Sequence, residues 1–199
     1  MIQGFAVGAR WASNYFRRML SITIAGGKGI GALRAQNTCH DVNRKYVLNN
    51  RAVRAMGNDE RAICDLLDAF TRAIYLKDSA GAIAPLADDA VTFDLAPPLQ
   101  QGPEVTHDPD RLEEWFATWK GPIVSEPEQR TIVVDNNVAY AYGLQRMTGT
   151  KTNGEQVELW FRATACFRRD NGEWRITHMH NSVPFAMDGS ERALLDLKP

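Results

Sequence analysis

The feature that most constrains this sequence is a pair of long segments of mixed apolar and polar residues, within residues 155–184, joined at Asn171-Gly172. Asn-Gly is a strong signal for a two-residue hairpin, because both central positions of such a turn need positive φ and these two residues tolerate it best. We therefore predict two adjacent antiparallel strands. Most candidate functional residues fall in this stretch, and we expect the rest of the chain to cover it.

Each strand of this hairpin has two chemically different faces, since successive side chains in a strand point to opposite sides. On the last strand, alternation groups Trp174, Ile176, His178 and His180. On the preceding strand, alternation separates a face of mixed polarity from an apolar face. The mixed face carries Trp160, Arg162, Thr164 and Cys166, and the apolar face carries Leu159, Phe161, Ala163, Ala165 and Phe167. We predict that the mixed face lines a partly polar pocket.

Composition indicates one globular domain with an extension. The 199 residues are 44% hydrophobic, enough to bury a core, and the net charge of −1 does not indicate nucleic-acid binding. The charge is unevenly distributed: residues 1–57 hold nine Lys or Arg and one acid, whereas residues 58–199 hold 14 basic and 23 acidic residues. This break predicts a basic N-terminal extension, residues 1–57, outside the core of a domain formed by residues 58–199.

The basic extension has three interpretations. Arg17-Arg18 before an apolar run resembles a twin-arginine export signal, and the Arg-rich, acid-poor composition resembles an organelle transit peptide. Lys28 interrupts the apolar run, which argues against a targeting signal. We favour a segment outside the fold, or a start placed before a true start at Met56, because a compositional break of this kind usually marks a segment outside the fold. No run of about 20 apolar residues is present, so no transmembrane helix is expected. Three scattered cysteines indicate a reducing compartment, and we expect the cytoplasm.

From residue 58 onward, the hydrophobic pattern predicts helices followed by strands. Apolar residues at three- and four-residue spacing form one helical stripe, Asp78 is placed to begin a second helix, and Asp108-Pro109 to begin a third. The turn residues Asn136-Asn137 and Asn153-Gly154 divide the remainder into strands. The expected elements are helices near residues 58–76, 79–83 and 109–120, a strand at 90–95, and a four-stranded meander from residue 129. This order is an α+β plan.

Several segments of residues 58–199 resemble one known family. They are FDLAPPL at residues 93–99, LEEWFATWKGPI at 112–123, RATACFRRDNGEWRITHMHNSVPF at 162–185 and the closing LLDLKP. With the order of elements, they resemble the SnoaL-like, ketosteroid-isomerase-like branch of the nuclear transport factor 2-like superfamily. The resemblance implies a cone-shaped half-barrel, with helices packed in the concave face of a curved four-stranded antiparallel meander and a short extra strand.

The resemblance also implies a pocket between sheet and helices, and pairing of two copies through the exposed sheet face. Functions in this family include isomerases, dehydratases, polyketide cyclases and domains without catalysis, so the fold does not determine the function. Asp94 falls where the family's general base lies, but the oxyanion donors would fall near Phe70 and Ala163, which have no side-chain donor. Losing one donor costs roughly 3 to 4 kcal/mol, so steroid isomerase activity itself is not expected.

Four ionisable residues are the candidate catalytic groups. Asp94 follows an apolar strand, where desolvation would raise the pKa of its carboxyl, but it is equally suited to ordering the Pro97-Pro98 loop. His178 and His180 lie two apart on one strand face, and are candidates for pocket lining, an acid/base pair, structural hydrogen bonding or metal ligation. Arg162 lies inside a strand, where a guanidinium must pair with a ligand anion or an acid such as Glu158.

Aromatic residues complete the expected pocket. Aromatic residues at helical spacing most often pack in the core. We expect at least one of these rings to reach the pocket wall. The expected lining comprises Trp160, Trp115, Trp119, Phe70 and Thr164.

Two functions fit these residues. The first is cofactor-free acid/base chemistry of isomerase, dehydratase or cyclase type on a small apolar carbonyl compound, with Asp94 as base. The alternative is a non-catalytic domain of the same fold that binds a ligand or dimerises. We expect a homodimer, because an outer sheet face carrying Phe161 and Phe167 would be too apolar for a monomer. We expect no cofactor, metal, nucleic acid or membrane partner.

Overall fold

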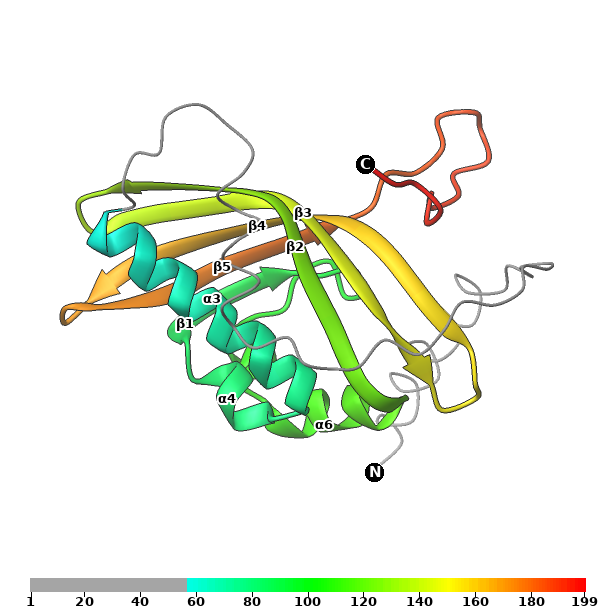
Figure 1. Cartoon of the computed structure of the whole chain (residues 1–199), viewed down its shortest axis with the longest axis horizontal. Helices are drawn as coiled ribbons and strands as arrows, with labels where there is room; N and C mark the ends of the chain where they lie inside the picture. The colour runs from blue at the N-terminus through cyan, green and yellow to red at the C-terminus, as the bar shows by residue number, and fades with distance from the viewer. Residues whose placement is uncertain (1–56) are drawn as a thin grey trace, which may run out of the picture. The chain divides into compact units, whose positions relative to one another are not determined.

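The structure is a computed structural model that describes residues 57–199, which form a mixed five-stranded sheet with helices packed against it (Figure 1). The strand order is β1-β5-β4-β3-β2, in which β1 is parallel to β5 and all other neighbours are antiparallel. The elements are α3 (Asn58–Leu76), α4 (Ser79–Ile83), β1 (Leu86–Phe93), α5 (Pro103–Thr106), α6 (Pro109–Ala117), β2 (Trp119–Asp135), β3 (Val138–Lys151), β4 (Gln156–Asp170) and β5 (Glu173–Ser182).

This arrangement confirms the α+β fold class, the four-stranded antiparallel meander and the extra strand. The extra strand β1 lies at the edge of the sheet beside β5, the last strand of the meander. The predicted extension falls almost wholly on residues 1–56, which lie outside the described residues. Among the helices of residues 57–199, none is long and apolar enough to cross a membrane.

The helix boundaries follow from local chemistry. Glu60 accepts a hydrogen bond from the Gly57 backbone N–H at 2.9 Å, which satisfies a donor at the start of α3. Lys77 adopts the left-handed conformation that ends this helix, with φ of 58°. Asp78 Oδ1 then accepts from Gly81 N at 2.9 Å, and Asp108 Oδ1 accepts from Asp110 N at 3.1 Å, so both predicted caps are confirmed.

The turns between strands also form as the sequence predicts. Asn171 and Gly172 both have positive φ, 51° and 88°, as a two-residue hairpin between β4 and β5 requires. Asn136 has φ of 53° in the turn between β2 and β3. Gly154 has φ of 88° in the turn between β3 and β4.

The inner face of the sheet, meaning the side that packs against α3, carries the core. Phe167 of β4 is 2% exposed and belongs to the same buried cluster as Ile63 of α3 and Ile176 of β5. By alternation, Ala163, Ala165 and Phe161 of β4 share this inner face. The prediction that Phe161 and Phe167 lie on the outer face is therefore wrong: large apolar side chains pack under the helices, and the mixed face points away from them.

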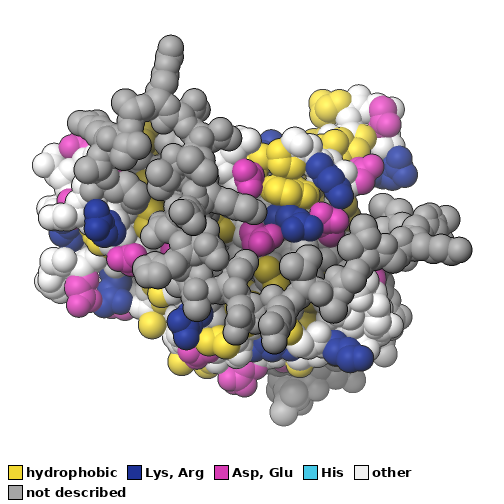
Figure 2. Space-filling model, viewed as in Figure 1, with side chains coloured by type: hydrophobic (Ala, Val, Ile, Leu, Met, Phe, Trp, Pro, Cys, Tyr) yellow, Lys and Arg dark blue, Asp and Glu magenta, His cyan; other side chains and the backbone are white. Residues whose placement is uncertain are grey.

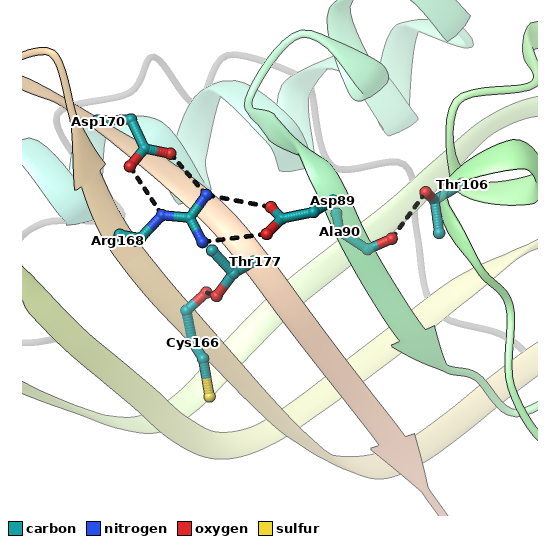
Figure 3. Close-up of polar contacts among 7 residues, drawn as sticks. All are labelled: Asp89, Ala90, Thr106, Cys166, Arg168, Asp170 and Thr177. Atoms are coloured by element: carbon teal, nitrogen blue, oxygen red, sulfur yellow. Dashed lines mark hydrogen bonds and ion pairs between the residues drawn. The ribbon is translucent and has the colours of Figure 1, made fainter.

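A β-bulge in β5 changes which side chains share a face. The register between β4 and β5 shifts after Cys166 pairs with His178, because Phe167 pairs with Ile176. Thr177 is the extra residue, and its Oγ1 donates to the Cys166 carbonyl at 3.3 Å, which replaces part of the interrupted ladder (Figure 3). Trp174 and Ile176 therefore face the core, whereas His178 and His180 face outward.

A charge-assisted clamp holds the edge strand β1 to the hairpin (Figure 3). Arg168 of β4 donates to both oxygens of Asp89 in β1 at 3.1 Å, and to both oxygens of Asp170 at 2.7 and 2.9 Å. Asp89 lies in the part of β1 where the register with β5 is irregular, between Leu86 and Val91. The clamp thus supplies cross-strand contacts where regular pairing is interrupted.

The long strand β2 also has an irregularity, at which it bends across the inner face. Its register with β3 shifts between Glu128 and Thr131, where Gln129 has φ of 55°. A Cβ at the neighbouring Gly143 would lie 3.0 Å from the Arg130 Cα and 3.1 Å from two backbone oxygens. Glycine at this position therefore permits the close approach of β2, and the bend turns Arg130 toward α3.

Candidate functional site

The structure separates the predicted site residues onto opposite faces of the sheet. Strand register pairs Thr164 with His180 and Cys166 with His178, and paired residues point to the same side. Because Ala163, Ala165 and Phe167 face the core, their alternating neighbours on β4 face outward. The outward-facing members of the predicted site are Trp160, Arg162, Thr164, His178 and His180.

The prediction that Arg162 is a buried guanidinium is wrong. Arg162 is exposed, and within residues 57–199 it forms no ion pair or hydrogen bond through its side chain. The arginine that is largely shielded from water and faces α3 is Arg130, whose side chain is 11% exposed and forms an ion pair with Asp68 of α3 at 3.5 Å. Alternation alone does not distinguish the two, because the bend in β2 brings Arg130 inward.

The two histidines have structural contacts on the outer face. His178 Nδ1 lies 2.7 Å from the Val91 carbonyl oxygen, so Nδ1 carries a proton and donates to the neighbouring strand. The Phe93 ring packs edge-on against both imidazoles, with centroid distances of 4.7 Å to His178 and 5.7 Å to His180. Among residues 57–199 no group of three metal-ligating side chains gathers.

On the inner face, half-buried side chains form a continuous strip beside the closed core, which we call the inner-face strip. Asn181 of β5 lies opposite Ala163, which lies opposite Gly143. On the same face, two residues further along, Phe161 lies opposite Gln145, and two residues beyond that Leu159 lies opposite Met147. The strip comprises Asn181, Ala163, Phe161, Gln145 and Leu159, none of which is fully buried.

Asp94 lies at the end of this strip. Its Oδ1 accepts hydrogen bonds from the Leu95 backbone N–H at 2.7 Å and from the Asn181 amide at 3.2 Å. Asp94 itself is exposed, and its Oδ2 accepts no hydrogen bond from the described residues. The result is an oriented carboxylate with one open oxygen, which is what a proton acceptor needs. The bond to Leu95 also fits the alternative that Asp94 orders the following loop.

Two further polar groups lie along the inner face, and sequence reasoning missed both. Gln145 Nε2 donates to Ser125 Oγ at 2.7 Å, which leaves its second N–H for another acceptor. The Arg130 guanidinium lies near Cys64, and burial raises the pKa of the Cys64 thiol despite that positive charge. Once Ala165 is known to face inward, alternation along β4 places Ala163 and Phe161 on the inner face. Strand pairing then places Asn181 and Gln145 beside them.

Trp119 closes the far end of the inner face. It is 2% exposed, and its ring lies 6.0 Å from that of Trp115 in an edge-on arrangement. Lys151 Nζ lies 3.6 Å from the Trp119 ring centroid and donates to Thr118 Oγ1 at 3.0 Å. Burial lowers the pKa of Lys151 to about 8. These contacts show that Trp119 belongs to the core. Trp119 is the first residue of β2, whereas the sequence predicted that it would lie at the end of the preceding helix.

His107 is a polar group on the loop side of β1. Its Nδ1 lies 3.0 Å from the Pro103 carbonyl oxygen, which can only accept, so this nitrogen carries the proton in the neutral ring. Its Nε2 is buried and has no hydrogen-bond partner among the described residues. The adjoining Thr106, the last residue of α5, donates to the Ala90 carbonyl at 3.2 Å, which fixes α5 to the edge strand (Figure 3).

Comparison with protein families finds a match to the SnoaL-like domain over residues 63–186. The chain belongs to this SnoaL-like domain family. This assignment confirms the resemblance noted in the sequence, and it fits an inner face that is partly closed by helices and partly open. The match covers every strand of the sheet and most of α3.

Solved structures with the same fold include proteins with several named activities. A nuclear transport factor 2-like protein of unknown function from Pseudomonas putida KT2440 is 34% identical, with a TM-score of 0.63 over 71% of this chain and 96% of that one. A candidate ketosteroid isomerase from Shewanella frigidimarina is 18% identical, with a TM-score of 0.52 over 61% and 94%. A candidate dehydratase from Streptomyces avermitilis is 15% identical, with a TM-score of 0.56 over 64% and 97%. No curated protein matches the chain.

Proposed function

We propose that this SnoaL-like protein binds a small, largely apolar carbonyl compound on its inner face and catalyses cofactor-free proton transfer with Asp94 as base. The observation that carries the proposal is the Asp94 carboxylate, held through Oδ1 by Leu95 N–H and Asn181 while Oδ2 stays open. The strip beside it is mostly apolar, so a bound carbonyl compound would lose water around its reactive carbon. Named isomerase and dehydratase relatives of the same fold support this reaction class.

The chemistry requires a base and a donor on the same face. Asp94 Oδ2 would take a proton from the carbon next to the carbonyl, and Asn181 would hold the carboxylate in position. The second N–H of Gln145 is the neutral donor that the strip offers to the carbonyl oxygen. Arg162, His178 and His180 face the other side of the sheet, so they have no part in this proposed reaction.

The proposal predicts that Asp94→Asn removes proton abstraction without disturbing the fold. The assay is hydrogen–deuterium exchange at the carbon next to the carbonyl of 2-tetralone in deuterated buffer, followed by proton NMR. We expect Asp94→Asn to slow the catalysed exchange by about 100-fold or more, which is the usual contribution of a general base. The matched control is Asp88→Asn, an exposed acid of β1, the strand that ends just before Asp94, and it should leave the rate unchanged.

Equal exchange by wild type and Asp94→Asn, or no exchange above buffer with any cyclic ketone tested, would contradict the catalytic role. In that event a second function, ligand binding without catalysis, is the better one. The resemblance to the family favours it, because the family's oxyanion donors would fall near Phe70 and Ala163, which have no side-chain donor. Mass spectrometry of ligand retained by wild type and by Asp94→Asn distinguishes the two, because a binding protein should retain the same compound in both.

We also infer a homodimer formed through the outer face. Three exposed aromatic residues lie there: Tyr140 and Tyr142 stack at a centroid distance of 6.3 Å, and Phe93 is on the same side. Tyrosine and arginine are enriched in protein interfaces, and an aromatic patch of this kind is unusual on a monomer. This surface replaces the one expected from the sequence, where Phe161 and Phe167 would have formed it.

A further inference from the structure

The last 17 residues, 183–199, form an arm beyond β5 that has its own internal structure. Ala186 N donates to the Arg192 carbonyl and Leu194 N to the Pro184 carbonyl, both at 2.8 Å, while Phe185 pairs with Ala193 as a bridge. These bonds close a small hairpin in the arm. In Figure 1 it extends past the end of the sheet, away from α4 and α6.

The tip of this hairpin carries two acids. Asp188 Oδ1 accepts from Ser190 N at 2.9 Å, a bond that orders the turn, and Glu191 is exposed beside it. Hydrogen bonding to Ser190 holds the pKa of Asp188 below its usual range, so this carboxyl is ionised at neutral pH. Neither acid forms a direct ion pair with another residue in 57–199, although the charge of Arg192, on the same hairpin, also helps to lower the pKa of Asp188. With two acids and one arginine, the hairpin keeps a net negative charge.

Apolar side chains on the arm are unusually exposed for such an ordered segment. Phe185 is 59% exposed and Met187 is 89% exposed. Figure 2 shows hydrophobic side chains on the arm, at the upper right, together with acidic and basic ones. A short hairpin that orders itself while leaving these groups in water is suited to contact another surface.

The base of the arm adjoins the outer face of the sheet. Ser182, the last residue of β5, pairs in register with Arg162 of β4. The end of the arm returns to the same face, where Lys198 Nζ lies 3.3 Å from Glu158 Oε2. Arg162 is therefore an exposed cation at the root of an arm whose tip is acidic, yet cation and tip do not pair within one chain.

We propose that the C-terminal arms are exchanged in the homodimer, so that the acidic tip of each arm pairs with Arg162 of the other copy. This inference rests on the proposed homodimer and adds the contacts that fix it. Both halves of the contact belong to this chain, so a twofold axis satisfies both copies at once. Charge complementarity between an acidic tip and an unpaired guanidinium identifies the partner as a second copy, and the exposed Phe185 and Met187 provide apolar contact around the pair.

The test uses charge reversal in the full-length protein and measures mass and dimer affinity by light scattering and sedimentation. The face variant is Arg162→Glu. The arm variant combines Asp188→Asn with Glu191→Lys, because asparagine keeps the acceptor that the Ser190 backbone N–H needs. Each variant alone should weaken dimerisation by about tenfold or more, since like charges then meet at both symmetric contacts. The matched control is Asp135→Lys, at a distant strand end.

Mixing the two variants separates exchange from pairing within one chain. The face variant offers an acidic face and an acidic arm, and the arm variant offers Arg162 and a basic arm, so a heterodimer restores both pairs. We expect an equimolar mixture to recover wild-type dimer affinity. If only the triple variant, with all changes in one chain, recovers dimerisation and the mixture does not, the arm pairs within its own chain and exchange is wrong.

The remaining outcomes distinguish this inference from the proposed dimer. A wild-type protein that stays monomeric at micromolar concentration contradicts the dimer itself and the exchange with it. A wild-type dimer that all reversals leave unchanged contradicts only the exchange. Circular dichroism and thermal melts of each variant check that the fold is retained.

Discussion

Lys151 shows how one buried side chain makes stability depend on pH. Its ammonium lies over the Trp119 ring and is mostly shielded from water, and burial lowers its pKa from 10.5 to about 8. Between these two values the unfolded chain binds more protons than the folded one, so folding becomes more favourable as pH rises from 8 to 10.5. Below pH 8 the Lys151 ammonium is charged in both the folded and the unfolded chain, so burying its charge lowers the unfolding free energy by its full amount.

We predict that Lys151→Met gains stability relative to wild type at pH 7 and loses that advantage by about pH 10. The difference in unfolding free energy between the two proteins should change by on the order of 2 kcal/mol over this range, with the cation–π contact and the bond to Thr118 offsetting part of the gain. Urea unfolding at both pH values measures it. Lys120→Met, on an exposed neighbour, is the control, and a pH-independent difference would contradict the prediction.

Arginine placement shows which residue-level inferences the sequence allowed. We expected that a guanidinium buried inside a strand would need a partner of opposite charge. The ion pair between Arg130 and Asp68 fits that rule. The sequence pointed to Arg162 instead, because alternation does not say which face is inner. Asp94 was identified from its place after an apolar strand, but its partner Asn181 was not, since that contact joins residues 87 positions apart.

At the scale of elements, local chemistry predicted the turns and helix starts, and long-range packing decided the rest. Asn171-Gly172, Asp78 and Asp108 act through backbone geometry and neighbouring N–H groups, so their roles can be read from a few residues. The bulge at Thr177 has no such local signal. It depends on the fit of β5 between β1 and β4, and it moves both histidines to the outer face.

The clamp made by Arg168 leads to a prediction about the edge strand. Arg168→Met should loosen β1 from β5, because Asp89 and Asp170 then lose their shared cation and are left as neighbouring anions. Amide hydrogen exchange should quicken at Val91 and Phe93, which alternate with Thr92 along the strand and face β5, while β3 and β4 stay protected. An unchanged exchange pattern would mean that backbone pairing alone holds this edge.

The same clamp sets the direction of an acid effect. Hydrogen bonds from Arg168 lower the pKa of both Asp89 and Asp170 in the folded protein. Stability from these carboxylates is present above their unfolded pKa, near 4, and is lost as pH falls through the folded values. Below about pH 4, acid should therefore reduce the melting temperature of wild type more steeply than that of Arg168→Met. The contacts are exposed, so salt should diminish the difference.

For the whole molecule, the two faces of one sheet have separate proposed tasks. The inner face combines an oriented carboxylate with a mostly apolar strip. The outer face combines exposed aromatic rings with Arg162, which has no side-chain partner within residues 57–199. Substitutions on one face should therefore leave the other function intact. Asp94→Asn should keep wild-type dimer affinity, and outer-face variants should keep their ligand.

The outer face gives a direct test of association. Tyr142 is 49% exposed and lies in one cross-strand row with Thr164, His180 and Phe93, near the middle of the sheet. Tyr142→Glu would place a carboxylate there in each copy, and a twofold axis would apply the change twice. We expect dimer affinity to fall by about 100-fold or more, because like charges across an interface cost several kcal/mol.

The fold should tolerate this substitution, since a side chain half in water loses little packing when it is replaced. Sedimentation velocity across nanomolar to micromolar concentrations measures the affinity, with Asn136→Glu, in an exposed turn, as the charge-matched control. If Tyr142→Glu stays as dimeric as wild type, the outer face is not the interface. If Tyr142→Glu becomes monomeric and still catalyses hydrogen–deuterium exchange of the ketone, or retains its ligand, at the wild-type level, the inner site of each copy works without the second copy.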